Sequence, residues 1–145
     1  MDPFPHHYEA HASAESDGDV LLDANGAATL EVGAPVQFGG PGGQWSPETL
    51  LVAAAASCFV LTFRSVAANS KLAWSRLECD AHGVLERRDG VTRFTGLHVR
   101  ARLELPGGSD PERAKRLLDK AEKGCLVTSS LALAATLESE VVVAG

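Results

Sequence analysis

The longest apolar stretch of the sequence, residues 50–63, predicts a helix that is buried on all sides. A helix at a protein surface keeps one polar face, whereas apolar residues here occupy every face. A helix start precedes the stretch, because Ser46 can accept hydrogen bonds from first-turn amides and Pro47 suits the first helical position. Glu48 then places a negative charge where the helix dipole favours it. We expect the helix to extend from residue 47 to about residue 68.

The pattern elsewhere predicts short strands and a second, amphipathic helix. Asp110 is a capping residue and Pro111 a first helical residue, so this helix should begin there. Gly124 suits the left-handed conformation that ends a helix, and residues 125–133 are expected to form a short helical segment. Strands mixed irregularly with helices indicate an α+β fold in one domain, residues 1–145. The expected strands are residues 8–14, 19–22, 29–32, 77–86, 91–105 and 137–143.

Composition narrows the class of protein. The 145 residues are 45 % hydrophobic and 22 % charged, which is ordinary for a globular domain. The net charge of −6, with no basic stripe, argues against a nucleic-acid partner. The apolar run 50–63 is shorter than the ~20 residues that span a bilayer, and residues 1–11 lack a signal-peptide pattern. We therefore expect a cytoplasmic protein with no membrane partner.

The three cysteines are the candidate chemistry. Cytoplasmic thiols are kept reduced, so a disulfide would be transient and chemical. Cys79 shares a predicted strand face with Ala81 and Leu85, which is typical of a small buried residue. Cys58 lies too deep in its helix for the helix dipole to act on it, and would need a basic partner to ionise. Spacing alone leaves open whether Cys58 and Cys125 form a catalytic pair. No cysteine or histidine pattern has metal-ligand spacing, so we expect neither a metal nor a cofactor.

Two segments of the sequence carry a family resemblance. The first joins the glycine-rich loop Phe38-Gly39-Gly40-Pro41-Gly42-Gly43 to the helix start 46–51 and to Ala56-Ser57-Cys58-Phe59. The second reads AEKGCLVTSSL, at residues 121–131. In this order they resemble the Ohr/OsmC family of thiol-dependent peroxidases. The glycine-rich loop and the segment SKLAW, residues 70–74, resemble the broad OsmC-like branch of that family. The resemblance spans residues 8–143. It implies an OsmC-like fold, with antiparallel sheets packed around two main helices in an intertwined homodimer.

The resemblance also implies roles for particular residues. Cys58 corresponds to the peroxidatic thiol, Cys125 to the resolving thiol, and Glu48 to the active-site glutamate of the family. The implied partners are an organic hydroperoxide, a dithiol-type reductant and a second copy of the chain. The family also uses an arginine from the loop before the helix, but the first arginine here is Arg64, after Cys58. Arg100, Arg102 or a histidine could substitute.

Helix geometry makes a further demand on Glu48. Ten residues of helix rise about 15 Å, so Glu48 cannot touch Cys58 of its own helix. If it acts at the thiol, it comes from a second copy whose helix runs the opposite way. Packing against that copy would also cover the second face of the apolar helix, so we expect an obligate dimer.

Other functions remain open at this point. The chain could be a non-catalytic redox sensor of the same fold, or a protein that binds a small apolar ligand. For the peroxidase, apolar side chains of the long helix and the glycine-rich loop could form a wall that favours alkyl hydroperoxides. These side chains are Phe38, Phe59, Leu61 and Phe63.

Overall fold

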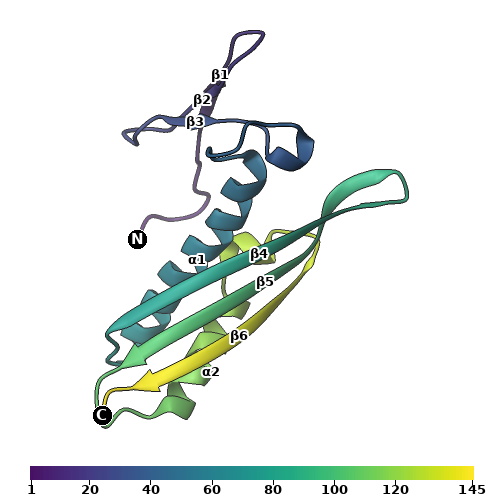
Figure 1. Ribbon diagram of the computed structural model, residues 1–145. Helices are drawn as coiled ribbons and strands as arrows, with labels where there is room; N and C mark the ends of the chain where they lie inside the picture. Colours follow the sequence, from purple (N-terminus) through teal and green to yellow (C-terminus); the bar gives the residue numbers. More distant parts are fainter. The chain divides into compact units, whose positions relative to one another are not determined.

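The computed structural model describes residues 1–145, which form two compact units, Met1–Leu50 and Leu51–Gly145. The first unit contains a three-stranded antiparallel sheet in the order β1-β2-β3 (Figure 1). A 3-10 turn, η1 (Val36–Phe38), and the first turn of helix α1 (Pro47–Asn69) follow it. The three expected N-terminal strands are confirmed, although the first is shorter than predicted. Their bounds are β1 His11–Ser13, β2 Val20–Asp23 and β3 Leu30–Val32.

Helix α1 begins and ends with hydrogen bonds that its sequence explains. The amide of Thr49 donates to the Ser46 hydroxyl at 3.1 Å, and the Ser46 amide donates to the Thr49 hydroxyl at 2.9 Å. This reciprocal pair confirms Ser46 as the cap. At the other end, Lys71 takes a left-handed conformation (φ 52°), and the amides of Lys71 and Leu72 donate back to carbonyls of the last turn. The helix therefore ends with a left-handed residue other than glycine.

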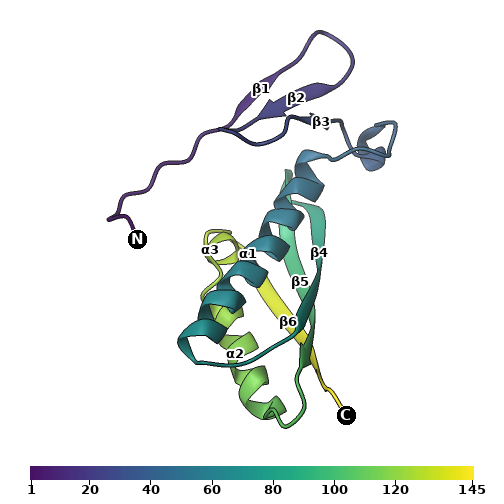
Figure 2. The ribbon, with the colours of Figure 1, turned by 90° about the vertical axis from the view of Figure 1, so that its left-hand side faces the viewer.

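The second unit is a three-stranded sheet covered on one face by helices (Figures 1 and 2). β4 and β5 form the expected antiparallel hairpin, but β6 pairs parallel to β5, from Gly96 opposite Ala134 to Leu105 opposite Val143. The prediction of purely antiparallel sheets is therefore wrong for this pair. The chain between β5 and β6 crosses the sheet through α2 and α3, and such a crossover returns the next strand in the same direction. The bounds are β4 Arg76–Arg88, β5 Val91–Leu105, α2 Pro111–Lys123, α3 Leu126–Ser129 and β6 Ala134–Val143.

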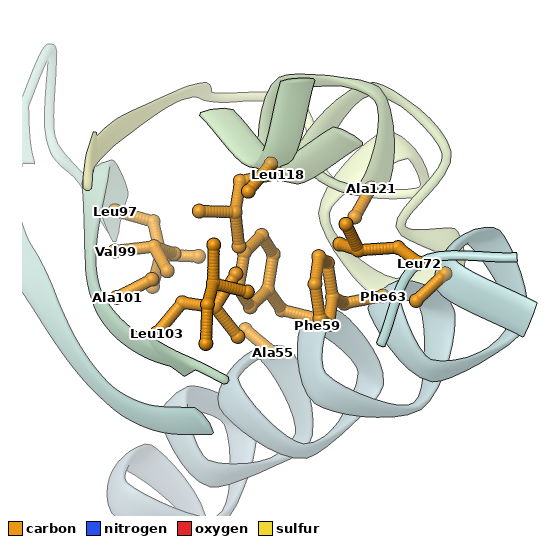
Figure 3. Close-up of a cluster of buried hydrophobic side chains, with 13 residues drawn as sticks. Ala55, Phe59, Phe63, Leu72, Leu97, Val99, Ala101, Leu103, Leu118 and Ala121 are labelled. Atoms are coloured by element: carbon orange, nitrogen blue, oxygen red, sulfur yellow. The ribbon is translucent and has the colours of Figure 1, made fainter. Parts of the chain in front are cut away.

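The hydrophobic core of this unit lies between α1, α2 and the inner face of β5. The buried residues of α1 recur every four positions, at Ala55, Phe59, Phe63 and Ala67. Figure 3 shows the Phe59 ring between Leu118 of α2 and the aliphatic side chains of β5. The α+β architecture predicted from the sequence is confirmed.

The helix α1 is buried along this one stripe only, so the prediction of burial on all sides is wrong for the single chain. Only 22 % of its most apolar 18-residue window is buried. By length and composition alone, the 23 residues of α1 could cross a membrane, whereas the prediction considered only the shorter apolar run 50–63. A core helix of a water-soluble protein has the same length and composition. Within the second unit, the remaining apolar faces of α1 lack a covering element.

Two local details of the second unit differ from the prediction. A register shift between Val84 and Leu85 interrupts the β4–β5 pairing, and Leu85 is exposed. Cys79 and Leu85 therefore do not share a buried face, because the irregularity reverses the alternation of side chains.

Gly124 has φ −92°, so the left-handed conformation predicted for it is wrong. The chain turns at the next residue instead, since Cys125 is extended (φ −66°, ψ 115°).

Candidate functional site

The structure brings the two predicted thiols together beside α1. Cys58 lies half-buried in the middle of α1, and Cys125 precedes the first residue of α3 with 1 % of its surface exposed. The Cys125 sulfur lies 4.0 Å from the carbonyl oxygen of Ala55, and the Cys125 side chain is one of the groups that lower the pKa of Cys58. Both thiols are free. Two free thiols held close together on separate elements are one condition for a reversible disulfide.

Hydrogen-bond donors surround the Cys58 sulfur. Burial by itself raises the pKa of this thiol, but hydrogen bonds outweigh the burial and the net effect lowers the pKa. The strongest of them comes from the backbone amide of Val127, followed by the Cys125 side chain, the Leu126 amide and the Thr62 side chain. Donors of this kind stabilise a thiolate. The backbone amides at the start of α3 thus lower the pKa of Cys58, an effect that the sequence had predicted from a basic residue.

The basic residues considered as substitutes lie elsewhere. Arg100 and Arg102 alternate with buried residues of β5, so they lie on the sheet face opposite the core, and Arg64 is exposed on α1. Arg100 contacts Glu138 at 3.5 Å, and Arg102 contacts Glu104 at 2.5 Å. No cation contributes to the pKa of Cys58 within the chain. The prediction that Arg100 or Arg102 takes the place of the family's arginine is therefore wrong for a site within one chain.

Cys79 differs from the other two cysteines. Burial is the main cause that raises the pKa of its thiol to about 11, and the nearby Asp80 and Cys125 add to the effect. Such a thiol stays protonated at neutral pH and is a poor nucleophile. This supports the interpretation of Cys79 as a packing residue. No group of three or more His, Cys, Asp or Glu side chains could hold a metal ion.

Glu48 lies in the first turn of α1, within the first unit, and its Oε2 atom is buried without a hydrogen-bond partner. It lines a hollow of about 470 Å³ whose other lining residues are apolar. A buried carboxylate oxygen without a hydrogen-bond partner is energetically costly. The other lining residues include Val20, Leu22, Val32, Phe38 and Leu50.

The structure corrects the predicted apolar wall. Phe59 and Phe63 are 1 % and 0 % exposed, so they are core residues that no substrate can reach. Leu61 of α1 is 59 % exposed, on a face that the second unit leaves uncovered. Phe38 lines the hollow with Glu48. Only the last two could contact a substrate or a second copy.

Sequence reasoning missed three contributors to the site: Thr62 and the amides of Leu126 and Val127. Backbone amides leave no signature in the sequence, and only the proximity of a helix start to Cys58 reveals them. Thr62 carries one signal, since it lies four residues after Cys58 and therefore on the same helix face.

Comparisons with known proteins relate the chain to one family and fold. Residues 40–140 match the family model described as OsmC-like protein. A protein of Xanthomonas axonopodis pv. citri named organic hydroperoxide resistance protein is 28 % identical over 123 residues, which is 81 % of this chain and 82 % of that protein. The uncharacterised YmaD of Bacillus subtilis is 25 % identical over 130 residues, 87 % of each chain. The solved structure of an OsmC-like protein of unknown function from Vibrio cholerae superposes with a TM-score of 0.85 at 19 % identity, covering 94 % of this chain and 100 % of that one.

Proposed function

The chain belongs to the OsmC-like family, and on that basis we propose that it is a thiol-dependent peroxidase that reduces organic hydroperoxides to alcohols. The observation that carries the proposal is the contact between Cys58 and Cys125, with donors that lower the pKa of Cys58. The name of the Xanthomonas relative supports the substrate class. The proposed location is the cytoplasm, where both thiols would be kept reduced.

The first chemical step uses the Cys58 thiolate. Its sulfur attacks the terminal peroxide oxygen, the O–O bond breaks, and the alkoxide leaves and takes up a proton to become the alcohol. The sulfur is oxidised by two electrons to a sulfenic acid, while the hydroperoxide is reduced. Donors that lower the pKa of Cys58 raise the fraction of reactive thiolate.

The second step uses Cys125. Its sulfur attacks the Cys58 sulfenic acid, a disulfide forms and water leaves. A dithiol reductant then supplies two electrons and two protons, which restores both thiols. Burial of Cys125 suits this role, because it limits direct reaction of its sulfur with the peroxide.

Two observations support the use of a second copy of the chain. The uncovered apolar faces of α1 need a covering surface, and the buried oxygen of Glu48 needs a partner. A second α1 that runs the opposite way would cover the first and bring its own Glu48 to the Cys58 of the other chain. We therefore propose an intertwined homodimer with two sites. A monomer in gel filtration at micromolar concentration would contradict this arrangement.

Turnover of cumene hydroperoxide with a dithiol, measured on matched cysteine variants, tests the function. We expect Cys58→Ser to abolish turnover, and Cys125→Ser to form one sulfenic acid per chain without recycling by the dithiol. Cys79→Ala is the control and should keep full turnover, because the protonated Cys79 takes no part. Normal turnover by Cys58→Ser would refute the mechanism.

A non-catalytic redox sensor or a protein that binds small apolar ligands is the second candidate. The absence of a cation at Cys58 favours it, since the thiolate then depends on neutral donors alone. Counting free thiols during titration with a hydroperoxide separates the two. Loss of two thiols per chain, faster than the oxidation of free cysteine, supports the peroxidase. Oxidation no faster than that of an ordinary buried thiol supports the alternative.

A further inference from the structure

We propose that Thr62 of α1 is the positioning residue for Cys58, in place of a charged side chain. Its hydroxyl makes a hydrogen bond with the Cys58 sulfur, and its methyl group lies beside Gly124, the residue before Cys125. The inference rests on the proposed peroxidase function and adds a residue to it.

The Thr62 hydroxyl is unusual among the helix hydroxyls in its choice of partner. The Ser57 hydroxyl donates to the carbonyl oxygens of Ala53 and Ala54, at 2.9 and 3.2 Å, as serine and threonine commonly do within helices. The Thr62 hydroxyl makes no such bond, and its hydrogen-bond partner is the Cys58 sulfur, at 4.0 Å. A distance of 4.0 Å is long for a neutral thiol, and a negatively charged sulfur would draw the donor closer.

The rest of the Thr62 side chain faces the segment that carries Cys125. A Cβ atom built on Gly124 would lie 3.6 Å from the Thr62 methyl carbon, so the two residues are neighbours. Threonine is branched at Cβ, and its χ1 angle is restricted in a helix. One rotamer therefore sets both the hydroxyl toward Cys58 and the methyl toward Gly124, which links the positions of the two thiol-bearing segments.

The reaction itself gives Thr62 a distinct role among the donors. Cys125 contributes a hydrogen bond to Cys58 only while it keeps its proton, and it loses that proton when it attacks the sulfenic acid. The hydroxyl of Thr62 is not consumed at any step. It is therefore the side-chain donor that remains at the Cys58 sulfur throughout the cycle.

Two variants separate the hydroxyl from the methyl group. Thr62→Val keeps the shape and removes the hydroxyl, whereas Thr62→Ser keeps the hydroxyl and removes the methyl. The readout is the rate at which iodoacetamide alkylates Cys58 in the reduced protein as a function of pH, with the alkylated peptide identified by mass spectrometry. We expect Thr62→Val to move the midpoint to higher pH and to slow alkylation at neutral pH by about three- to tenfold, the usual size of one hydrogen bond.

Thr62→Ser should keep the pH profile and slow disulfide formation after one equivalent of hydroperoxide. An unchanged profile in Thr62→Val, or an equal upward shift in Thr62→Ser, would overturn the inference. If Thr62→Val fails to fold, Thr62→Ala, which removes both groups and favours the helix, must show the same upward shift. Alkylation requires no turnover, so the two proposals can fail separately. If the unmodified protein has no peroxidase activity but Thr62→Val still shifts the alkylation profile, the proposed function is refuted and the role of Thr62 stands.

Discussion

Replacing Leu126 with proline should weaken the Cys58 thiolate with little change to the fold. Leu126 opens α3, a position that proline favours, and its side chain is 74 % exposed. The preceding residue, Cys125, is already extended (φ −66°, ψ 115°), as the residue before a proline must be. The substitution therefore removes one amide donor from the Cys58 sulfur and little else.

The size of the effect follows from the strength of one hydrogen bond. A hydrogen bond to a charged acceptor contributes about 1.5–3 kcal/mol, and the lower end applies because Cys58 is only half-buried. A loss of about 1.5 kcal/mol is roughly a tenfold loss of thiolate. The amide lowers the pKa of Cys58, so its removal raises the pKa. The alkylation rate should then rise at higher pH than in the unmodified protein, and be about tenfold lower at neutral pH.

The matched control is Leu126→Ala, which also removes the exposed side chain but keeps the amide. Alkylation of Cys58 by iodoacetamide is followed by peptide mass spectrometry across the neutral and alkaline range. Cys79, with a pKa of about 11, serves as an internal standard that should react only at far higher pH. Identical midpoints for Leu126→Pro and Leu126→Ala would show that the amides of α3 do not activate Cys58.

Three further predictions concern stability. Phe59→Ala should lower the free energy of unfolding by about 3–5 kcal/mol in urea titration, because the ring is 1 % exposed in the core; a loss below 1 kcal/mol would be incompatible with this packing. Asp110→Ala should cost about 1 kcal/mol, since Oδ1 accepts from the amides of Glu112 and Arg113, and Asp110→Asn should restore most of the loss in thermal unfolding. Gly124→Ala should raise stability by about 0.5 kcal/mol, because φ is −92° and the nearest atom to a new Cβ is 3.4 Å away. A marked loss would instead favour a left-handed Gly124.

Local signals in the sequence were sufficient for most of the fold. Ser46 and Asp110 mark helix starts, and the hairpin turn before Val91 marks the start of β5 as the structure has it. The parallel pairing of β6 could not be read in this way, because strand direction depends on the path of the crossover and not on local pattern. The register shift at Leu85 was missed for a similar reason, since alternation of apolar residues does not show which residue the partner strand skips.

The candidate site, too, could be predicted from the sequence only in part. The resemblance marked Cys58 and Cys125, and their contact depends on how the segment after α2 packs on α1. The sequence left Arg100, Arg102 or a histidine open as the cation, and the two arginines lie on the face of β5 directed away from the core. The donors that the structure does show are largely main-chain groups, which any residue other than proline would supply.

The parallel strand β6 also bears on the order in which the second unit folds. The hairpin of β4 and β5 pairs residues close in sequence, whereas β6 reaches β5 only after the whole crossover from Pro106 to Leu133 has been closed. Contacts between distant parts of a chain form slowly, since the entropy of closing the loop is lost first. We expect β6 to join the sheet late, so a newly made chain would have its β4–β5 hairpin before its three-stranded sheet is complete.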